Sequence, residues 1–247
     1  MNTKDRHLKK LLLELARDNQ FTPFICNFCD RWCERCPKTQ NCLYFANEQE
    51  SKGFAFNEND NDSVNEVFWN AIDAFEDYRF IVLIQNSTDS EKSKPGVSHS
   101  VELAQEYANE IQAWINNNET LFKDGTDPIL ARINNTELTI SDALEILSWY
   151  GPVIASKTQR SVAELDIRLD RNLDHEMNPF RDNIGSAKIA IIGCNRSMAV
   201  LSMFYKKFNR QKNEILAFLK HLSSLKNNIL MIFPEAMQFV RPGFDEK

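Results

Sequence analysis

Apolar side chains recur every three or four residues over most of the chain, which is the spacing of one face of an α-helix. The pattern predicts a short amphipathic helix at 4–18, a long helix at about 142–166 and a last helix from Lys212 onward. The clearest apolar stripes are Leu103, Tyr107, Ile111 and Trp114, and then Ile215, Leu219, Leu222 and Leu225. The sequence therefore predicts a mainly α protein.

Polar residues that cap helices mark where several of these helices begin. Ser63, followed by Glu66 three residues later, forms the pattern of a capping box, and Ser98 and Ser141 are further predicted N-caps. After Ser63 the apolar residues continue as a buried helix, with Phe68, Ile72, Phe75 and the run Ile81–Ile84. The last nine residues, FVRPGFDEK, are predicted to be a non-helical tail.

Two apolar runs fit either a buried strand or a helix: Lys188–Cys194 and Ile229–Phe233. A strand that ends at Gly193 and leads into a helix would be the start of a dinucleotide-binding turn. That turn needs the pattern G-x-G-x-x-G, and here Asn195 and Met198 occupy the second and third glycine positions. We therefore predict a continuous helix from about 183 to 208.

Composition limits the class of protein further. The chain has 247 residues with 43% hydrophobic content, which is typical of a folded domain, and its seven Gly and eight Pro argue against a turn-rich all-β fold. The net charge of −6 argues against a broad nucleic-acid interface. The sequence pattern has neither a secretory signal nor an apolar run of the ~18 residues needed to span a bilayer. These observations predict a cytoplasmic protein without a membrane segment.

Five of the six cysteines fall within seventeen residues, in the spacing C-x2-C-x3-C-x2-C-x5-C. In a reducing compartment such a cluster is typical of metal binding rather than of disulfides. The clustered residues are Cys26, Cys29, Cys33, Cys36 and Cys42, whereas Cys194 stands alone in an apolar run and is predicted to be a core residue.

Zinc is the metal that this spacing favours. It binds four thiolates in a closed tetrahedral site, which usually supports structure rather than catalysis. The spacing predicts Cys29, Cys33 and Cys36 on one side of a single helical turn, with Cys42 as the fourth ligand and Cys26 as a possible substitute for it. Three cations lie between the cysteines and would offset the negative charge of such a site: Arg31, Arg35 and Lys38.

Two alternatives remain open at the same cysteines. Cys29-x3-Cys33-x2-Cys36 matches the three-cysteine spacing of radical S-adenosylmethionine enzymes, which would make the centre an iron–sulfur cluster. Against this, Arg35 precedes the third cysteine where that family usually has an aromatic residue. Seven glycines also hardly suffice for its β/α barrel. The other alternative is a set of reduced, packed thiols without metal.

Several segments together resemble a family of uncharacterised bacterial proteins. They are CDRWCERC at 29–36 with Cys42, Trp149-Tyr150 with Lys157 and Arg160, GSAK at 185–188 with Arg196-Ser197, and RPGF at 241–244. The resemblance covers the N-terminal module and the C-terminal hundred residues. It implies the architecture and the importance of the clustered cysteines, and it implies no activity.

Several cations lie within otherwise apolar helical segments. Lys157 and Arg160 share one helix face, and Lys188 and Arg196 are about two turns apart on the next long helix. Because a buried charge needs a partner, ordinary salt bridges, for example to Asp182, are one reading. The other reading is a pocket for a small anionic ligand such as phosphate or carboxylate, closed by Arg241.

The sequence thus predicts a helical bundle-like body at 63–247, a polar linker at 47–62 and a small N-terminal cysteine-rich metal module at 1–46. The leading functional hypothesis is a metal-binding protein with a structural four-cysteine zinc site and a non-catalytic interaction or adaptor role, whose protein partner is unknown. The alternatives are an iron–sulfur redox or radical enzyme that uses the same cysteines, and a helical protein that binds a small anion.

Overall fold

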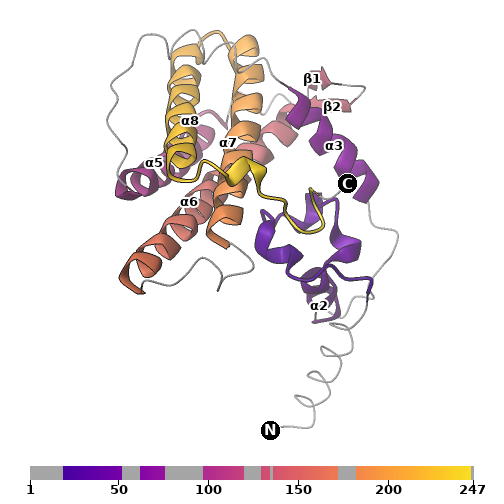
Figure 1. Ribbon diagram of the computed structural model, residues 1–247. Helices are drawn as coiled ribbons and strands as arrows, with labels where there is room; N and C mark the ends of the chain where they lie inside the picture. Colours follow the sequence, from indigo (N-terminus) through magenta and orange to yellow (C-terminus); the bar gives the residue numbers. More distant parts are fainter. Residues whose placement is uncertain are drawn as a thin grey trace. The chain divides into compact units, whose positions relative to one another are not determined.

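The computed structural model describes residues 19–51, 62–75, 97–119, 129–133, 136–171 and 182–245. Within these ranges the protein is mainly helical, as predicted (Figure 1). The chain divides into two compact units, one made of Met1–Val67 with Val240–Lys247 and the other of Phe68–Phe239. The predicted helix at 4–18 and the run Ile81–Ile84 lie outside the described residues.

The first unit contains three short 3₁₀ helices and the helix α2 (Leu43–Ser51). The 3₁₀ helices are η1 (Ile25–Phe28), η2 (Cys33–Arg35) and η3 (Thr39–Asn41). α2 reaches into the segment predicted to be a linker. The helix α3 (Asp62–Ala74) begins one residue before Ser63, the predicted cap, and runs across the boundary between the two units.

The last eight residues belong to this first unit, whereas the sequence analysis assigned them to the helical body. The reason is a turn at Gly243, whose positive φ of 75° favours glycine. A Cβ on Gly243 would lie 2.7 Å from Cδ1 of Ile25, so the tail turns tightly against η1. The turn is held by Arg241, whose guanidinium Nη2 pairs with Asp245 Oδ1 at 2.8 Å.

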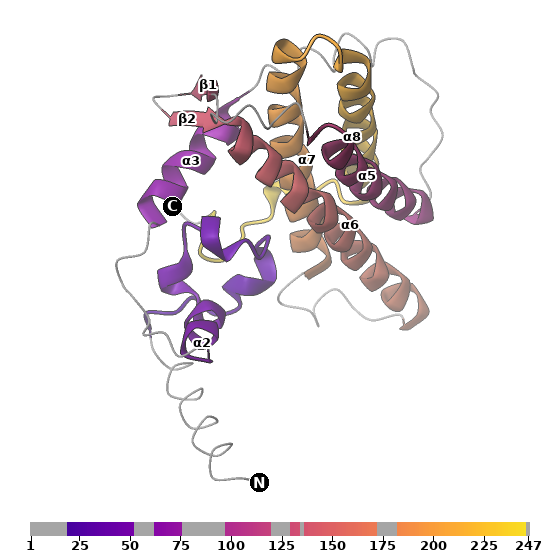
Figure 2. The ribbon, with the colours of Figure 1, turned by 180° about the vertical axis from the view of Figure 1, so that it is seen from behind.

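In the described part of the second unit there are four long helices: α5 (Val97–Asn117), α6 (Ile140–Arg171), α7 (Asp182–Lys207) and α8 (Lys212–Ile232). α6 packs on α7 and α5, and α8 packs on α7 and α5, so the four helices form one bundle-like body (Figures 1 and 2). The predicted apolar stripes face its core, since Tyr107, Ile111, Ile215, Leu219 and Leu222 are buried.

α7 is one continuous helix, which confirms the preferred reading of the segment Lys188–Cys194. Ile229 likewise belongs to a helix, α8, rather than to a strand. Among the described helices, α7 is long and apolar enough to cross a membrane by length and composition, but 83% of its apolar window is buried inside the protein. A central core helix has the same composition because it is covered on most sides.

A small β-hairpin that the sequence pattern did not reveal precedes α6. β1 (Ile129–Ile133) and β2 (Thr136–Thr139) pair antiparallel, with Ile133 opposite Thr136. The helix α6 then begins at a reciprocal cap, in which the Asp142 backbone N–H donates to Thr139 Oγ1 (3.1 Å) and the Thr139 N–H to Asp142 Oδ2 (3.1 Å). The prediction of Ser141 as the cap is therefore wrong.

Gly193 allows α6 and α7 to approach closely, and this contact yields a prediction. A Cβ at this position would lie 2.9 Å from both Ile154 Cγ1 and Tyr150 Cδ1, two fully buried side chains. We expect Gly193→Ala to lower the free energy of unfolding by about 1–3 kcal/mol from overpacking, even though alanine favours helix by ~1 kcal/mol. Urea denaturation measures the change.

The matched control is Gly151→Ala, on α6 where it faces α5. Its nearest contact would be the Ile111 Cγ2 methyl at 3.2 Å, so the neighbour needs to move less. If Gly151→Ala lowers the free energy of unfolding as much as Gly193→Ala does, the close approach of α6 and α7 at Gly193 is not the cause.

Candidate metal centre

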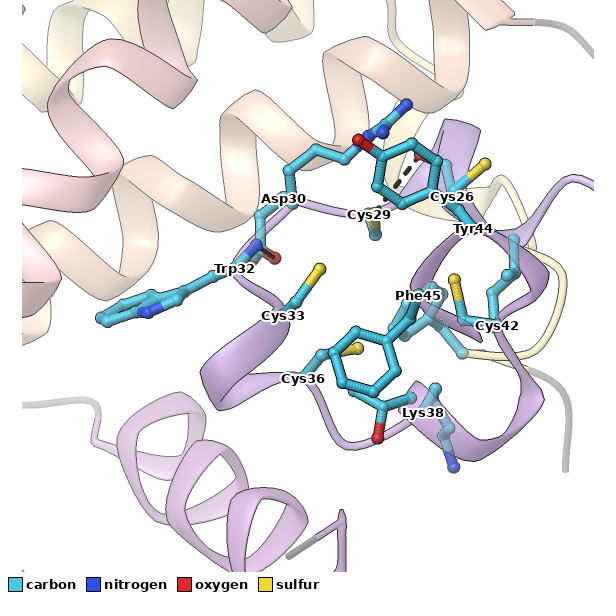
Figure 3. A pocket seen from close by; sticks show the side chains of 14 residues that line it. Cys26, Cys29, Asp30, Trp32, Cys33, Cys36, Lys38, Cys42, Tyr44 and Phe45 are labelled. Carbon is cyan, nitrogen blue, oxygen red and sulfur yellow. Dashed lines mark hydrogen bonds between the residues drawn. The ribbon is translucent and has the colours of Figure 1, made fainter. Parts of the chain in front are cut away.

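The five clustered cysteines line one small pocket in the first unit (Figure 3). The free space within it is about 20 Å³, close to the room needed by one water molecule. Around the thiols the wall includes Asp30, Arg31, Lys38 and Tyr44, together with Phe244 from the C-terminal tail. The sequence spacing alone suggested a cluster, and the fold brings all five members to the same space.

Short turns, rather than one helix, place these thiols. Cys26 lies within η1 and Cys29 follows its end, while Cys33 opens η2 and Cys36 ends it. The prediction that Cys29, Cys33 and Cys36 share a helical turn is therefore wrong. Between Cys29 and Cys33 the chain reverses at Arg31, whose φ of 64° is left-handed. A left-handed residue other than glycine costs ~1–2 kcal/mol, which the surrounding packing must offset.

Apolar side chains beneath the turns supply that packing. Ile25, Phe28 and Trp32 are buried. The Trp32 backbone N–H donates to Asp30 Oδ1 (3.2 Å), which closes a local turn just before η2. The two ends of the segment are joined where the Thr22 N–H donates to the Asn41 carbonyl (2.9 Å).

Burial dominates the electrostatics of the thiols. It raises the pKa of Cys33 from 9.0 to about 12, with further contributions from the charges of Cys29 and Cys42. Burial likewise raises the pKa of Cys36 and of Cys42. Without a cation these thiols stay protonated at neutral pH, because a buried thiolate is costly and neighbouring thiolates repel each other.

Backbone N–H groups nevertheless point at two of the sulfurs. The Lys38 N–H donates to Cys36, and the N–H groups of Tyr44 and Phe45 donate to Cys42; each bond lowers the pKa of the thiol it reaches. Cys42 immediately precedes α2 and occupies its N-cap position, where the helix offers free N–H groups. Such donors favour the thiolate, which is the form that binds metals.

The predicted cations lie around the same pocket. The Arg31 guanidinium lies 4.4 Å from the Tyr44 ring centroid and helps to lower the pKa of Cys42. Arg35 lies 5.9 Å from the Trp32 ring centroid, and Lys38 is part of the pocket wall.

The donor atoms fit a thiophilic metal in type and number. Within the described ranges, however, no three Cys, His, Asp or Glu side chains are close enough together to hold a metal ion. Ligation would therefore need the thiols to turn further inward. In Figure 3 the sulfurs of Cys33 and Cys36 point into the pocket, whereas that of Cys26 lies at the edge and points away.

Four of the predicted anion-binding cations have partners within their own unit: Arg160, Lys188, Arg196 and Arg241. Arg160 pairs with Asp182 (2.9 Å), as the salt-bridge reading predicted. Lys188 Nζ donates to the Phe239 carbonyl (2.5 Å), and Lys157 is buried on α6. Arg241 belongs to the first unit, where it pairs with Asp245. The binding of a small anion by these cations stays a prediction.

Arg196 makes the most extensive of these interactions. Its Nε and Nη2 each donate to the Asp73 carboxylate at 2.8 Å, and its Nη1 donates to the Tyr150 hydroxyl at 2.6 Å. The guanidinium carbon also lies 3.9 Å from the Trp69 ring centroid. Arg196 on α7 thus fixes the C-terminal half of α3 to α6, which is a structural role.

Sequence reasoning missed the Phe244 wall of the pocket and the N–H donors to the sulfurs. Phe244 is more than two hundred residues from the cysteines, and no local pattern connects them. The donors at Cys42 come from the start of α2, which directly follows Cys42, because a helix start offers free N–H groups.

Comparisons of the chain with protein-family models, with curated proteins and with solved structures found no match. The resemblance to bacterial proteins with the CDRWCERC motif therefore stays a prediction. What the pocket does must be argued from its own residues.

Arg196 and Arg160 should contribute differently to the free energy of unfolding, and one conservative substitution at each position tests this. Arg196→Lys removes the two-pronged pairing and the bond to Tyr150 at a side chain that is 12% exposed, so we expect a loss of about 1–3 kcal/mol in unfolding free energy. Arg160→Lys, at 44% exposure, should change stability by at most ~1 kcal/mol. Equal losses in urea denaturation would contradict the structural role of Arg196.

The raised thiol pKa values predict how the metal-free protein responds to alkali. Above pH 9.0 the unfolded chain loses the Cys33 proton, while the folded chain keeps it until about pH 12. The contribution of Cys33 to stability is therefore full below pH 9.0 and falls as the pH rises towards 12, by about 1 kcal/mol at about pH 10. Unfolding of chelator-treated protein at about pH 8 and pH 10 measures it.

The control for this prediction is Cys33→Ser, which removes one of the raised thiols. Cys194 also has a raised pKa but is present in both proteins, so the comparison isolates Cys33. The variant should lose less stability between the two pH values, and an identical loss would show that Cys33 does not titrate as described.

Proposed function

We propose that the first unit is a metal-binding module in which Cys29, Cys33, Cys36 and Cys42 hold one structural zinc ion. The observation that carries the proposal is the gathering of five thiols around one ion-sized space, with backbone N–H donors already directed at two of the sulfurs. A divalent cation would reverse the cost of ionising these thiols.

The choice of four ligands follows from electrostatic coupling. Burial has the largest effect on the pKa of both Cys33 and Cys36, and the thiolates that raise these pKa values further belong to Cys29, Cys33 and Cys42. Cys26 acts on Cys42 instead, and its sulfur lies at the pocket edge (Figure 3). Cys26 is therefore the extra thiol of the five.

We favour zinc over an iron–sulfur cluster because its four-ligand tetrahedral coordination matches four thiolates of the cysteine spacing. Four thiolates complete the coordination of zinc and leave no position for a substrate, which supports a non-catalytic role.

The role of the module is to form a surface for another protein. Among its described residues, the first unit has short 3₁₀ turns and few buried apolar side chains, and small units of this kind usually need a metal or a similar cross-link to be stable. With its core fixed by the metal, the unit exposes two aromatic rings, Phe24 at 50% and Tyr44 at 46%. Exposed aromatic side chains of this kind are typical of protein interfaces.

The test is elemental analysis and a visible spectrum of protein purified without oxygen. We expect one zinc per chain and no colour. Cys33→Ser and Cys36→Ser should each lose the metal and destabilise the first unit, because the free energy of binding a structural zinc ion also contributes to folding free energy. Limited proteolysis before α3 reports on the unit directly.

Cys194→Ser is the matched control, since it removes a thiol that is buried in α7, in the second unit. It should keep the zinc. If the analysis instead finds iron with sulfide and the protein is brown, the same cysteines hold an iron–sulfur cluster rather than zinc. Full zinc content in both Cys33→Ser and Cys36→Ser would contradict the site itself.

A further inference from the structure

We propose that Cys26 is an oxidation site that controls the metal, because peroxide joins it to Cys42 in a disulfide and so removes one of the four zinc ligands. The inference rests on the proposed zinc site and adds its regulation. An ion with four ligands leaves one of the five thiols of the pocket uncoordinated. The position of that thiol suits it to react with an oxidant.

Access separates Cys26 from its partner. Cys26 is half-buried at the rim of the pocket, and its sulfur points away from the interior (Figure 3). Its thiol makes a long hydrogen bond of 3.8 Å to Oδ1 of the neighbouring Asn27. Cys42, in contrast, is 9% exposed. A small oxidant from solvent therefore meets Cys26 before Cys42.

The fold also holds the two cysteine segments side by side. The Thr22 N–H donates to the Asn41 carbonyl (2.9 Å), and Asn41 Nδ2 donates to the Gln20 carbonyl (3.0 Å). Cys26 lies four residues after Thr22, and Cys42 follows Asn41 directly. Cys26 and Cys42 both line the same small pocket.

Cys42 is also suited to attack an oxidised partner. A cysteine that ligates zinc does so as its thiolate. The thiolate is the nucleophile of disulfide formation. Attack moves Cys42 from the metal towards Cys26, and it leaves Cys29, Cys33 and Cys36 as an incomplete set of three ligands.

The chemistry balances with hydrogen peroxide as the oxidant. The Cys26 thiol reacts with one peroxide to give a sulfenic acid and one water. The Cys42 thiolate then attacks the sulfenic sulfur, the S–S bond forms, and the departing hydroxide takes a proton from solvent to become a second water. Two thiols lose two electrons in total, and one peroxide is reduced to two waters.

The experiment treats the full-length, zinc-loaded protein with hydrogen peroxide and follows two readouts. A colorimetric chelator measures released zinc, and mass spectrometry of non-reduced proteolytic peptides maps the disulfide. We expect loss of the zinc together with a Cys26–Cys42 bridge, and we expect added dithiothreitol to reverse both. Cys26→Ser should bind zinc fully before treatment and lose the peroxide-driven release.

Cys194→Ser is the matched control, because it removes the one thiol outside the cluster, and it should release zinc like the unaltered chain. Release from Cys26→Ser as fast as from the unaltered chain, a bridge between any other pair, or loss of zinc from Cys26→Ser before treatment would each overturn the proposal.

The disulfide map also separates this proposal from the zinc site. Peroxide can join Cys26 to Cys42 in zinc-free protein, so the bridge is sought there as well. A protein that binds no zinc but forms the bridge contradicts the proposed function alone, whereas a protein that binds zinc but forms no bridge contradicts the oxidation site alone.

Discussion

The cost of placing five thiols around one small, partly buried space is the constraint on which the first unit depends. Thiolates repel each other there, and burial disfavours the ionised form of those deepest in it, so the thiols are stable either protonated or around a cation. The local backbone also adopts an unfavourable conformation in this arrangement, the left-handed one at Arg31. Backbone donors at Cys36 and Cys42 then act in the opposite direction and favour the ionised form.

The second unit is stabilised by a different kind of interaction. Its four helices bury their apolar stripes against each other, with Gly193 allowing a close approach between α6 and α7. One guanidinium, that of Arg196, binds a carboxylate on α3 and a hydroxyl on α6, and it stacks on Trp69. Because these groups satisfy each other, a cation in an apolar helix needs no external anion here.

The two proposals concern a single pocket and divide its cysteines by position. Four thiols suit a closed zinc site, and the fifth stands at the rim, where solvent reaches it first. A closed site offers no chemistry of its own, so its function lies in what it holds in place. Under these proposals, an extra thiol beside one of the ligands would connect that structural role to the oxidation state of the surroundings.

The sequence by itself determined the helical class, most of the long helices and the location of the thiol chemistry. Periodicity of about 3.6 residues and the spacing of cysteines are local properties, and residues such as Tyr107, Ile111 and Leu219 face the core that the pattern predicted. The hairpin before α6 escaped notice because its strands are only five and four residues long.

Only the tertiary structure decided which partners each side chain meets. Arg196 lies 123 residues from Asp73, and Phe244 lies far along the chain from the cysteines whose pocket it lines. The geometry of the cluster also escaped the sequence, because the left-handed turn at Arg31 replaces the expected helix. Spacing along the chain fixes which residues can be close, but long-range packing selects the backbone conformation and the charge partners.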